Sequence, residues 1–253
     1  MISQRKWPRP ALWLDANDAS TLTLDSTNVS AWACKSTGTV FTNTGTNRPT
    51  YVDVAFASGT KKAIRFTKAS VQYLGYTSAL LSGSVGTMLA VVKTLTNTDR
   101  GILYSQSMYN SYLPTARWLR MGQTSIYEQQ IFTNDDQGGG DILYSGTNAL
   151  SDQSIYLIGL IIGSTYQQLR RSGNIESRKG GESGNVVWFG NIIAFGADRS
   201  CIGAAFSSTT GSPSISSPFD GYIAELIAWN SELDTIDLNS VEKYLAQKYG
   251  IAI

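Results

Sequence analysis

The chain has 253 residues, 15% of them charged, 24 glycines and a formal net charge of +1. A near-neutral chain gives no electrostatic footprint for nucleic acid or an anionic membrane, and no apolar run reaches the ~20 residues of a membrane-spanning helix. The sequence contains no histidine, which removes the usual general base, the Ser–His and Cys–His nucleophile pairs and most zinc sites.

Short strands with turn residues between them fill most of the chain. Alternating or continuous apolar runs predict strands within 10–16, 29–35, 61–76, 86–95, 154–163, 164–174 and 185–191. The stretches 36–50, 133–153 and 207–218 are rich in turn residues, and none resembles a linker. We therefore expect an N-terminal arm (residues 1–10) followed by one all-β domain (residues 11–253), a β-sandwich of jelly-roll type.

The last 35 residues predict one more strand and a helix. Both alternating faces of 222–229 are largely apolar, which indicates a strand covered on both sides. Asp234 is a candidate N-cap, Leu238, Val241 and Leu245 form an apolar stripe of helical period, and Gly250 suits the position after a helix. A short C-terminal helix should therefore lie on a sheet.

The two ends of the chain resemble a known family. "ALWLDANDASTLT", "VSAW" and "TNRPTY" near the start, and "FDGYIAELIAWNSELDTIDLNSVEKYLAQKYGI" at the end, are similar to the two ends of concanavalin A-like, LamG-type jelly-roll domains found in bacterial and phage proteins. The resemblance implies the fold. It hardly restricts the function, because this fold hosts lectins, glycosidases, adhesion modules and viral coat parts.

The resemblance and the composition together favour a non-enzymatic phage virion surface protein. Such a protein would be a capsid decoration, head-fibre, tail-fibre or receptor-binding component, made in the host bacterial cytoplasm and carried on the virion. Its partners would be other coat or tail proteins and a host-surface glycan. The resemblance also implies a homotrimer, because jelly-roll proteins of virions are often trimeric. The first alternative is a carbohydrate-binding, lectin-like module, and the second is a glycoside hydrolase of the same fold.

No catalytic residue is assigned. Glucanases of this fold carry Glu-x-Asp-x-x-Glu on one strand, and the nearest match here is "ELDTID", with Glu232, Asp234 and Asp237. That run crosses a turn into the predicted helix, so its carboxylates should not share one face, and helix capping explains Asp234 and Asp237. We expect Glu225, within a buried strand, either to be paired for structural reasons or to lie at a strand edge.

Calcium is the one candidate cofactor, because the resemblance implies a calcium site with acidic ligands in a loop at the rim of the sandwich. The segment "TNDDQGGGD" offers Asp135, Asp136 and Asp141 beside glycines. A flexible polar loop is the simpler interpretation. Asp15 and Asp18 are expected at a strand end and in an Asx turn, and Cys34 and Cys201 as reduced, apolar thiols.

The segment "YSQSMYNSYLPTARWLRMG" (104–122) is the candidate binding surface. Rigid amphipathic rings beside adaptable hydrogen-bonding groups are typical of binding loops and of sugar sites. The candidate ligand-binding residues are Tyr109, Tyr112, Arg117, Trp118 and Arg120. The alternative is that these rings fill the edge of the sandwich.

The N-terminal arm is a candidate anchor to a partner coat protein. Pro8 and Pro10 disfavour a helix, and the segment has no signal-peptide pattern. The candidate anchoring residues are Arg5, Lys6, Trp7 and Arg9. Two alternatives stay open: a disordered leader, or Trp7 folded back on its own domain.

Overall fold

The computed structural model describes residues 7–95, 101–107, 116–121, 129–134, 141–144, 153–180, 188–189, 198–208 and 213–253. The strands of the first half are β1 (Leu12–Asp15), β2 (Leu22–Asp25), β3 (Asn28–Ala33), β4 (Val40–Thr42), β5 (Thr50–Phe56), β6 (Gly59–Phe66), β7 (Leu74–Tyr76), β8 (Gly86–Thr94) and β9 (Gly101–Ser107). Those of the second half are β10 (Ala116–Met121), β11 (Gln129–Asn134), β12 (Asp141–Tyr144), β13 (Ile155–Ile162), β14 (Tyr166–Arg171), β15 (Asn174–Gly180), β16 (Arg199–Ile202), β17 (Ala205–Ser208), β18 (Pro213–Ser216) and β19 (Gly221–Trp229). Two 3₁₀ turns, η1 (Ala19–Thr21) and η2 (Lys68–Ser70), and the helix α2 (Thr235–Tyr249) complete the described elements.

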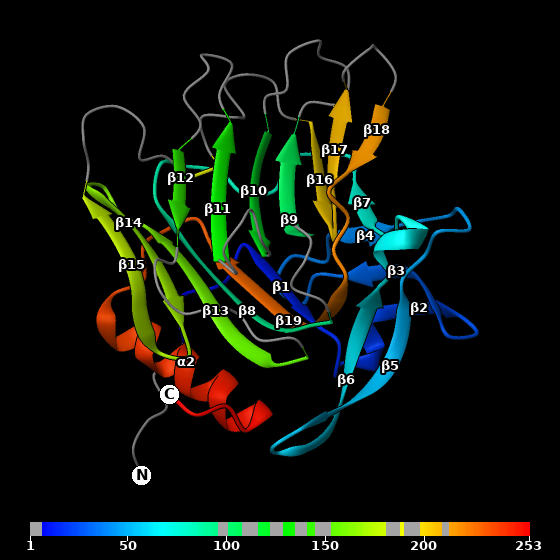
Figure 1. The fold of residues 1–253 in the computed structure, drawn as a ribbon, viewed down its shortest axis with the longest axis horizontal. Coiled ribbons are helices and arrows are strands. Elements are labelled where there is room, and N and C mark those ends of the chain that lie inside the picture. Colours follow the sequence, from blue (N-terminus) through cyan, green and yellow to red (C-terminus); the bar gives the residue numbers. More distant parts are fainter. Residues whose placement is uncertain are drawn as a thin grey trace.

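Antiparallel pairing joins the strands into a sandwich. Seventeen of the nineteen described strands belong to one hydrogen-bonded network, and β17 and β18 pair with each other. Strand β19 lies centrally, in register with β1, β6 and β8, and β8 continues into β13, β14 and β15. The second set of strands runs from β12 through β11, β10 and β9 to β16 and β7 (Figure 1). The predicted concanavalin A-like jelly-roll β-sandwich with a short C-terminal helix is confirmed.

Three strands bury both of their faces. One face of β8, β13 and β19 contributes Met88, Leu160 and Leu226 to a core inside the sandwich. The opposite face contributes Leu89, Ile161 and Ile227 to a second core beneath α2, which we call the helix-side core. Successive side chains of these strands point alternately into one core and the other. This explains why β19 is apolar on both sides.

The helix is capped at both ends as the sequence predicts. Asp234 accepts a hydrogen bond from the backbone N–H of Asp237 at 2.8 Å, and Leu238, Val241 and Leu245 are buried in the helix-side core. Gly250 ends the helix in the left-handed region at φ +67°, where a Cβ would lie 2.4 Å from the backbone nitrogen of Ser58. Glycine is thus required by the conformation and by the close approach to the β5–β6 turn.

Two sequence predictions need correction. The strand predicted over 185–191 is absent at Trp188 and Phe189, the two residues of it that the structure describes. Both rings are buried, and the Trp188 backbone N–H donates to Ser84 at 2.9 Å, so this apolar pair fills the core from a loop. The turn-rich stretches 36–50, 133–153 and 207–218 each contain a short strand: β4, β12 and β18.

Cys34 and Cys201 are both buried and free, as expected. Within the described ranges, no helix is long and apolar enough to cross a membrane.

Candidate functional site

A groove of about 460 Å³ opens where β4, β7, β16 and β17 meet. Thr42 on β4 and Cys201 on β16 both stand opposite Gly75 on β7, so three strands contribute neighbouring positions. We call this feature the groove, and its lining residues are Thr42, Asn43, Thr44, Gly45, Asn47, Tyr73, Gly75, Tyr76, Thr77, Arg199 and Phe206.

Aromatic rings are among the residues that line the groove. A Cβ at Gly75 would lie 3.0 Å from the ring of Phe206, so the missing side chain is what lets that ring rest on the strand. Tyr73 meets Phe206 edge to face, with centroids 5.6 Å apart. Both rings are half-buried, which leaves part of each available to a ligand.

A buried amide holds one wall of the groove in place. The side chain of Asn43 donates to the backbone oxygens of Tyr73 at 2.9 Å and Asn47 at 3.2 Å. It also accepts from the N–H of Gly45 at 2.9 Å, and Asn47 donates across to Val71 at 3.0 Å. Because these bonds exist without a ligand, the loop 43–47 is pre-organised, which lowers the entropic cost of binding.

Arg199 is the one charged residue among the groove's described lining residues. Its Nη1 donates to the backbone oxygen of Asp198 at 2.9 Å, and the Asp198 carboxylate lies 3.9 Å away. The side chain is 24% exposed, so the guanidinium is held at the groove without being sealed off. Its planar fork suits a carboxylate ligand.

The groove therefore combines half-exposed rings, amide and hydroxyl groups on a fixed loop, and one cation. Rings stack on the apolar faces of sugars, and the polar groups match their hydroxyls.

Comparison with known proteins gives structural matches only. No family model and no curated protein matches the chain. Domain 4 of AbnA, a GH43 extracellular arabinanase from Geobacillus stearothermophilus, in complex with arabinotriose, is similar at a TM-score of 0.63 and 12% identity, covering 94% of this chain and 100% of that one. The CBM40 of the Ruminococcus gnavus IT-sialidase, bound to α2,3-sialyllactose, is similar at 0.52 and 17% identity, covering 64% of this chain and 83% of that one.

The chain shares its fold with carbohydrate-binding modules. A leech intramolecular trans-sialidase is also similar, at a TM-score of 0.52 and 14% identity, with 80% of this chain and 27% of that chain covered. At these identities the likeness concerns the fold alone.

The predicted binding segment lies partly beside the groove. Tyr109 and Tyr112 fall outside the described residues, and Arg117, Trp118 and Arg120 lie on β10, of which only the backbone is described. Strand β10 pairs with β9, and Ser107 at the end of β9 stands opposite Arg199. The segment is thus partly sheet, and its binding role stays a prediction.

The candidate calcium ligands are not brought together in the described part of the chain. Asp135 and Asp136 fall outside it, and Asp141 begins β12, where only the backbone is described. Among the described residues, no cluster of three or more His, Cys, Asp or Glu side chains could hold a metal ion. Asp15 ends β1, and Asp18 accepts from the N–H of Ser20, which confirms the strand end and the turn.

The carboxylates of the near-match to a glucanase pattern serve the fold. Asp234 caps α2, and Glu232 accepts a hydrogen bond from the Tyr166 hydroxyl. Glu225 is fully buried and accepts from Lys248 at 2.7 Å, Trp13 at 2.8 Å and Tyr249 at 2.9 Å. The expected structural pairing of Glu225 is confirmed.

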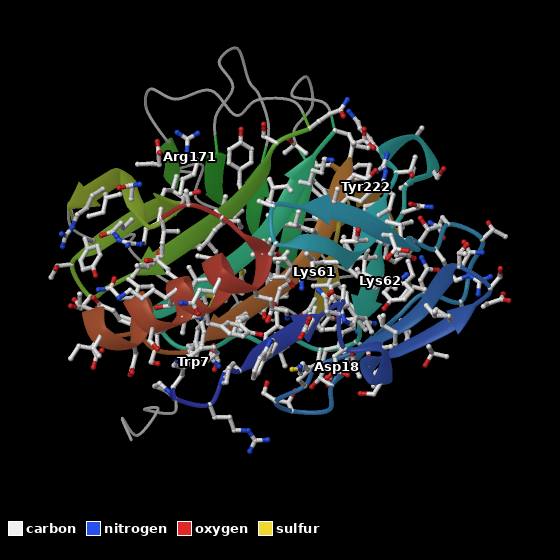
Figure 2. The ribbon with its side chains drawn as sticks, turned by 90° about the horizontal axis from the view of Figure 1, so that it is seen from below. Trp7, Asp18, Lys61, Lys62, Arg171 and Tyr222 are labelled. Atoms are coloured by element: carbon white, nitrogen blue, oxygen red, sulfur yellow. The ribbon has the colours of Figure 1, made fainter. Side chains whose placement is uncertain are left out.

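The described part of the arm contacts the domain. Trp7 donates to Ser240 at 3.1 Å and packs against Tyr244 of α2 with centroids 5.0 Å apart (Figure 2). Arg9 donates to the backbone oxygen of Ser36 at 3.1 Å, and Arg5 and Lys6 fall outside the described residues. Trp7 is therefore folded back on its own domain, and particle anchoring by this arm stays a prediction.

Sequence reasoning missed the groove. Its residues come from four segments as far apart as Thr42 and Phe206, and each segment carries only ordinary turn and strand residues. The one local signal is the density of Asn, Thr and Gly in "TNTGTN" ahead of a tyrosine-containing strand, which is typical of many turns.

Proposed function

We propose that this protein binds carbohydrate in the groove, without catalysing its cleavage. The observation that carries the proposal is the set of half-exposed rings beside a loop that Asn43 holds in place. A sugar binding there would find both a stacking surface and fixed hydrogen-bonding groups, so little ordering would be needed.

Two structural neighbours support the ligand class. The arabinanase domain is seen in complex with arabinotriose, and the sialidase module with a sialyllactose. For this chain, Arg199 favours a sugar that carries a carboxylate over a neutral one, because the guanidinium offers paired donors to two oxygens.

The non-catalytic part of the proposal rests on the carboxylates. Glycoside hydrolysis needs two carboxyl groups that flank the bond to be cleaved. Of the groups that the sequence offers for this role, Glu225 is buried against Lys248, and Asp234 caps a helix.

The virion role that the sequence resemblance implies stays a prediction, as do the coat or tail partners and the homotrimer. A sugar-binding groove is compatible with a receptor-binding part, and equally with a free lectin-like module.

The test is a glycan microarray followed by calorimetric titration of the strongest glycan. We expect Tyr73→Ala to weaken binding at least about tenfold, which is ~1.4 kcal/mol and within the range of one stacking contact. We expect Arg199→Gln to weaken acidic glycans selectively. Tyr222→Ala, which removes a half-buried ring on another face, is the matched control and should leave affinity unchanged. An array without any bound glycan, or equal losses in Tyr73→Ala and Tyr222→Ala, would refute the proposal.

A further inference from the structure

A second surface lies on the sheet face that α2 covers only in part. Arg65 on β6, Tyr222 on β19, Lys93 on β8 and Ile155 on β13 stand directly opposite one another, strand by strand. Residues opposite one another in a sheet share a face, and Tyr222 and Ile155 both pack against the helix-side core. We call these four residues the basic row.

Cations flank the aromatic ring of the row. The Arg65 guanidinium lies 5.4 Å and the Lys93 ammonium 5.9 Å from the centroid of Tyr222. Asp220 pairs with Arg65 at 2.9 Å, whereas Lys93 has no carboxylate within ion-pair distance among the described residues. Lys61 shares this face through the period of two, since Ala63 between it and Arg65 is buried in the helix-side core.

Lys61 likewise has no ion pair within the described part of the chain. Its neighbour Lys62 behaves differently, because it pairs with Asp53 at 2.9 Å. Lys61 and Tyr222 are both labelled in Figure 2. The face thus carries an excess of positive charge next to apolar side chains.

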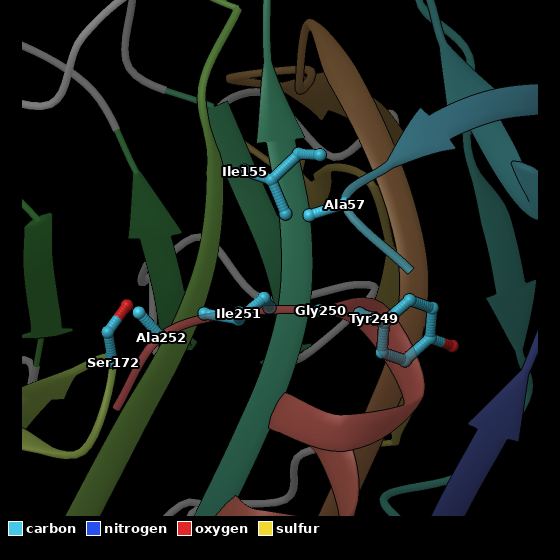
Figure 3. Close-up of a pocket in the computed structure, with 7 residues that line it drawn as sticks. All are labelled: Ala57, Ile155, Ser172, Tyr249, Gly250, Ile251 and Ala252. Atoms are coloured by element: carbon cyan, nitrogen blue, oxygen red, sulfur yellow. The ribbon is translucent and has the colours of Figure 1, made fainter. Parts of the chain in front are cut away.

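A hollow of about 310 Å³ adjoins the basic row at Ile155. The chain after α2 crosses one side of it, and Ala57 and Ile155 converge from the other side (Figure 3). We call this hollow the tail slot, and its lining residues are Ala57, Ile155, Ser172, Tyr249, Gly250, Ile251 and Ala252. The side chains that line it are mostly apolar.

We propose that the tail slot and the basic row together bind a single-chain anionic amphiphile, with the alkyl chain in the slot and the anionic headgroup at Lys93. An alkyl chain in the slot gains by leaving water. A headgroup at Lys93 meets a cation with no carboxylate within ion-pair distance in the described part of the chain, so it gains a charge-assisted contact. Ile155 belongs to both features, and this places the end of the slot beside Lys93.

The test is calorimetric titration of the full chain with sodium decanoate, and with tetraethylene glycol monodecyl ether as an uncharged probe that carries no sugar. Decanoate should bind at one site and the decyl ether about tenfold more weakly or not at all. Lys93→Glu should weaken decanoate by about tenfold, and Ala57→Trp, at an exposed turn position, should abolish binding by filling the slot. Lys243→Glu on the exposed side of α2 is the matched charge control and should bind as the wild type does.

Thermal melting of each variant shows that it is folded before titration. Three outcomes would overturn the proposal: no decanoate binding by the wild type, equal affinity for the uncharged decyl ether, or undiminished binding by folded Ala57→Trp. Glycan binding in the groove is a separate measurement, so this inference and the proposed function can fail independently.

Discussion

Arg170 on β14 and Glu242 on α2 form a bidentate ion pair across the edge of the helix-side core. Arg170 Nε lies 2.7 Å from Glu242 Oε1, and Arg170 Nη2 lies 2.9 Å from Glu242 Oε2. The two side chains are only 10% and 3% exposed, and Nη2 also donates to the backbone oxygen of Gly173. A fork of this geometry fixes both the position and the rotation of the helix on the sheet.

Replacing Glu242 with Gln should lower the free energy of unfolding by about 3–5 kcal/mol, because the buried guanidinium of Arg170 would lose its bidentate carboxylate partner. Chemical denaturation of wild type and variant measures the change. The matched control is Asp53→Asn in the exposed pair with Lys62, where a loss below about 1 kcal/mol is expected. Similar losses in the two variants would show that the buried ion pair contributes no more to the free energy of unfolding than the exposed pair does.

Replacing Leu245 with Asp should destabilise the domain by several kcal/mol, since a fully buried position would then hold an unpaired carboxylate. Ile236→Asp makes the same chemical change on the same helix at a residue that is 63% exposed. It should alter stability by no more than about 0.5 kcal/mol. A melting temperature unchanged by Leu245→Asp would mean that α2 is not docked on the sandwich.

Glu225 should make stability depend on pH. Burial, and then the charge of Asp15, raises the pKa of Glu225 above its ordinary value of 4.5, although Lys248 acts in the opposite direction. The folded state therefore holds this proton more tightly than the unfolded state. The resulting contribution to stability is complete below pH 4.5 and is lost as the pH rises through the raised pKa.

The measurement is urea unfolding of wild type and Glu225→Gln over a series of pH values. The free energy of unfolding of the wild type, relative to the variant, should fall as the pH rises from 4.5 towards the raised pKa. A relative stability that instead rises over this window would show that Lys248 outweighs burial.

The protein should release no reducing sugar from glucans, and Glu232→Gln should change nothing in that assay. Glu232 is exposed and bound to the Tyr166 hydroxyl, and Asp234 beyond it caps the helix. Sugar release that disappeared in the variant would establish a hydrolase and contradict the non-catalytic proposal.

The closing strand and helix were predictable because their signals are local. Residues 222–229 carry apolar side chains on both faces, and Asp234 and Gly250 mark the helix ends at the expected places. The internal pairing of Glu225 was also predictable in kind, since a carboxylate inside a buried strand must find partners. Its four donors, which include Trp13 and Tyr244, are set by tertiary packing and have no sequence signature.

Other features depended on packing that a linear pattern does not reveal. Trp188 and Phe189 look like part of a strand, yet they enter the core from a loop. Asp141–Tyr144 pairs with β11 despite the turn-forming residues around it. The groove depends on Gly75 giving room to Phe206, residues 131 positions apart in the chain (206 − 75), and no local pattern connects them.

Carbohydrate binding in the groove can be tested by locating the bound sugar with NMR. Amide signals of the full chain are followed during titration with α2,3-sialyllactose and, separately, with arabinotriose, the sugars seen with the two structural neighbours. We expect saturable shifts that centre on Gly45, Gly75 and Arg199, larger for the acidic sugar and lost in Tyr73→Ala. Shifts that centre on any other surface, or that persist unchanged in folded Tyr73→Ala, would contradict the assignment of the groove as the sugar site.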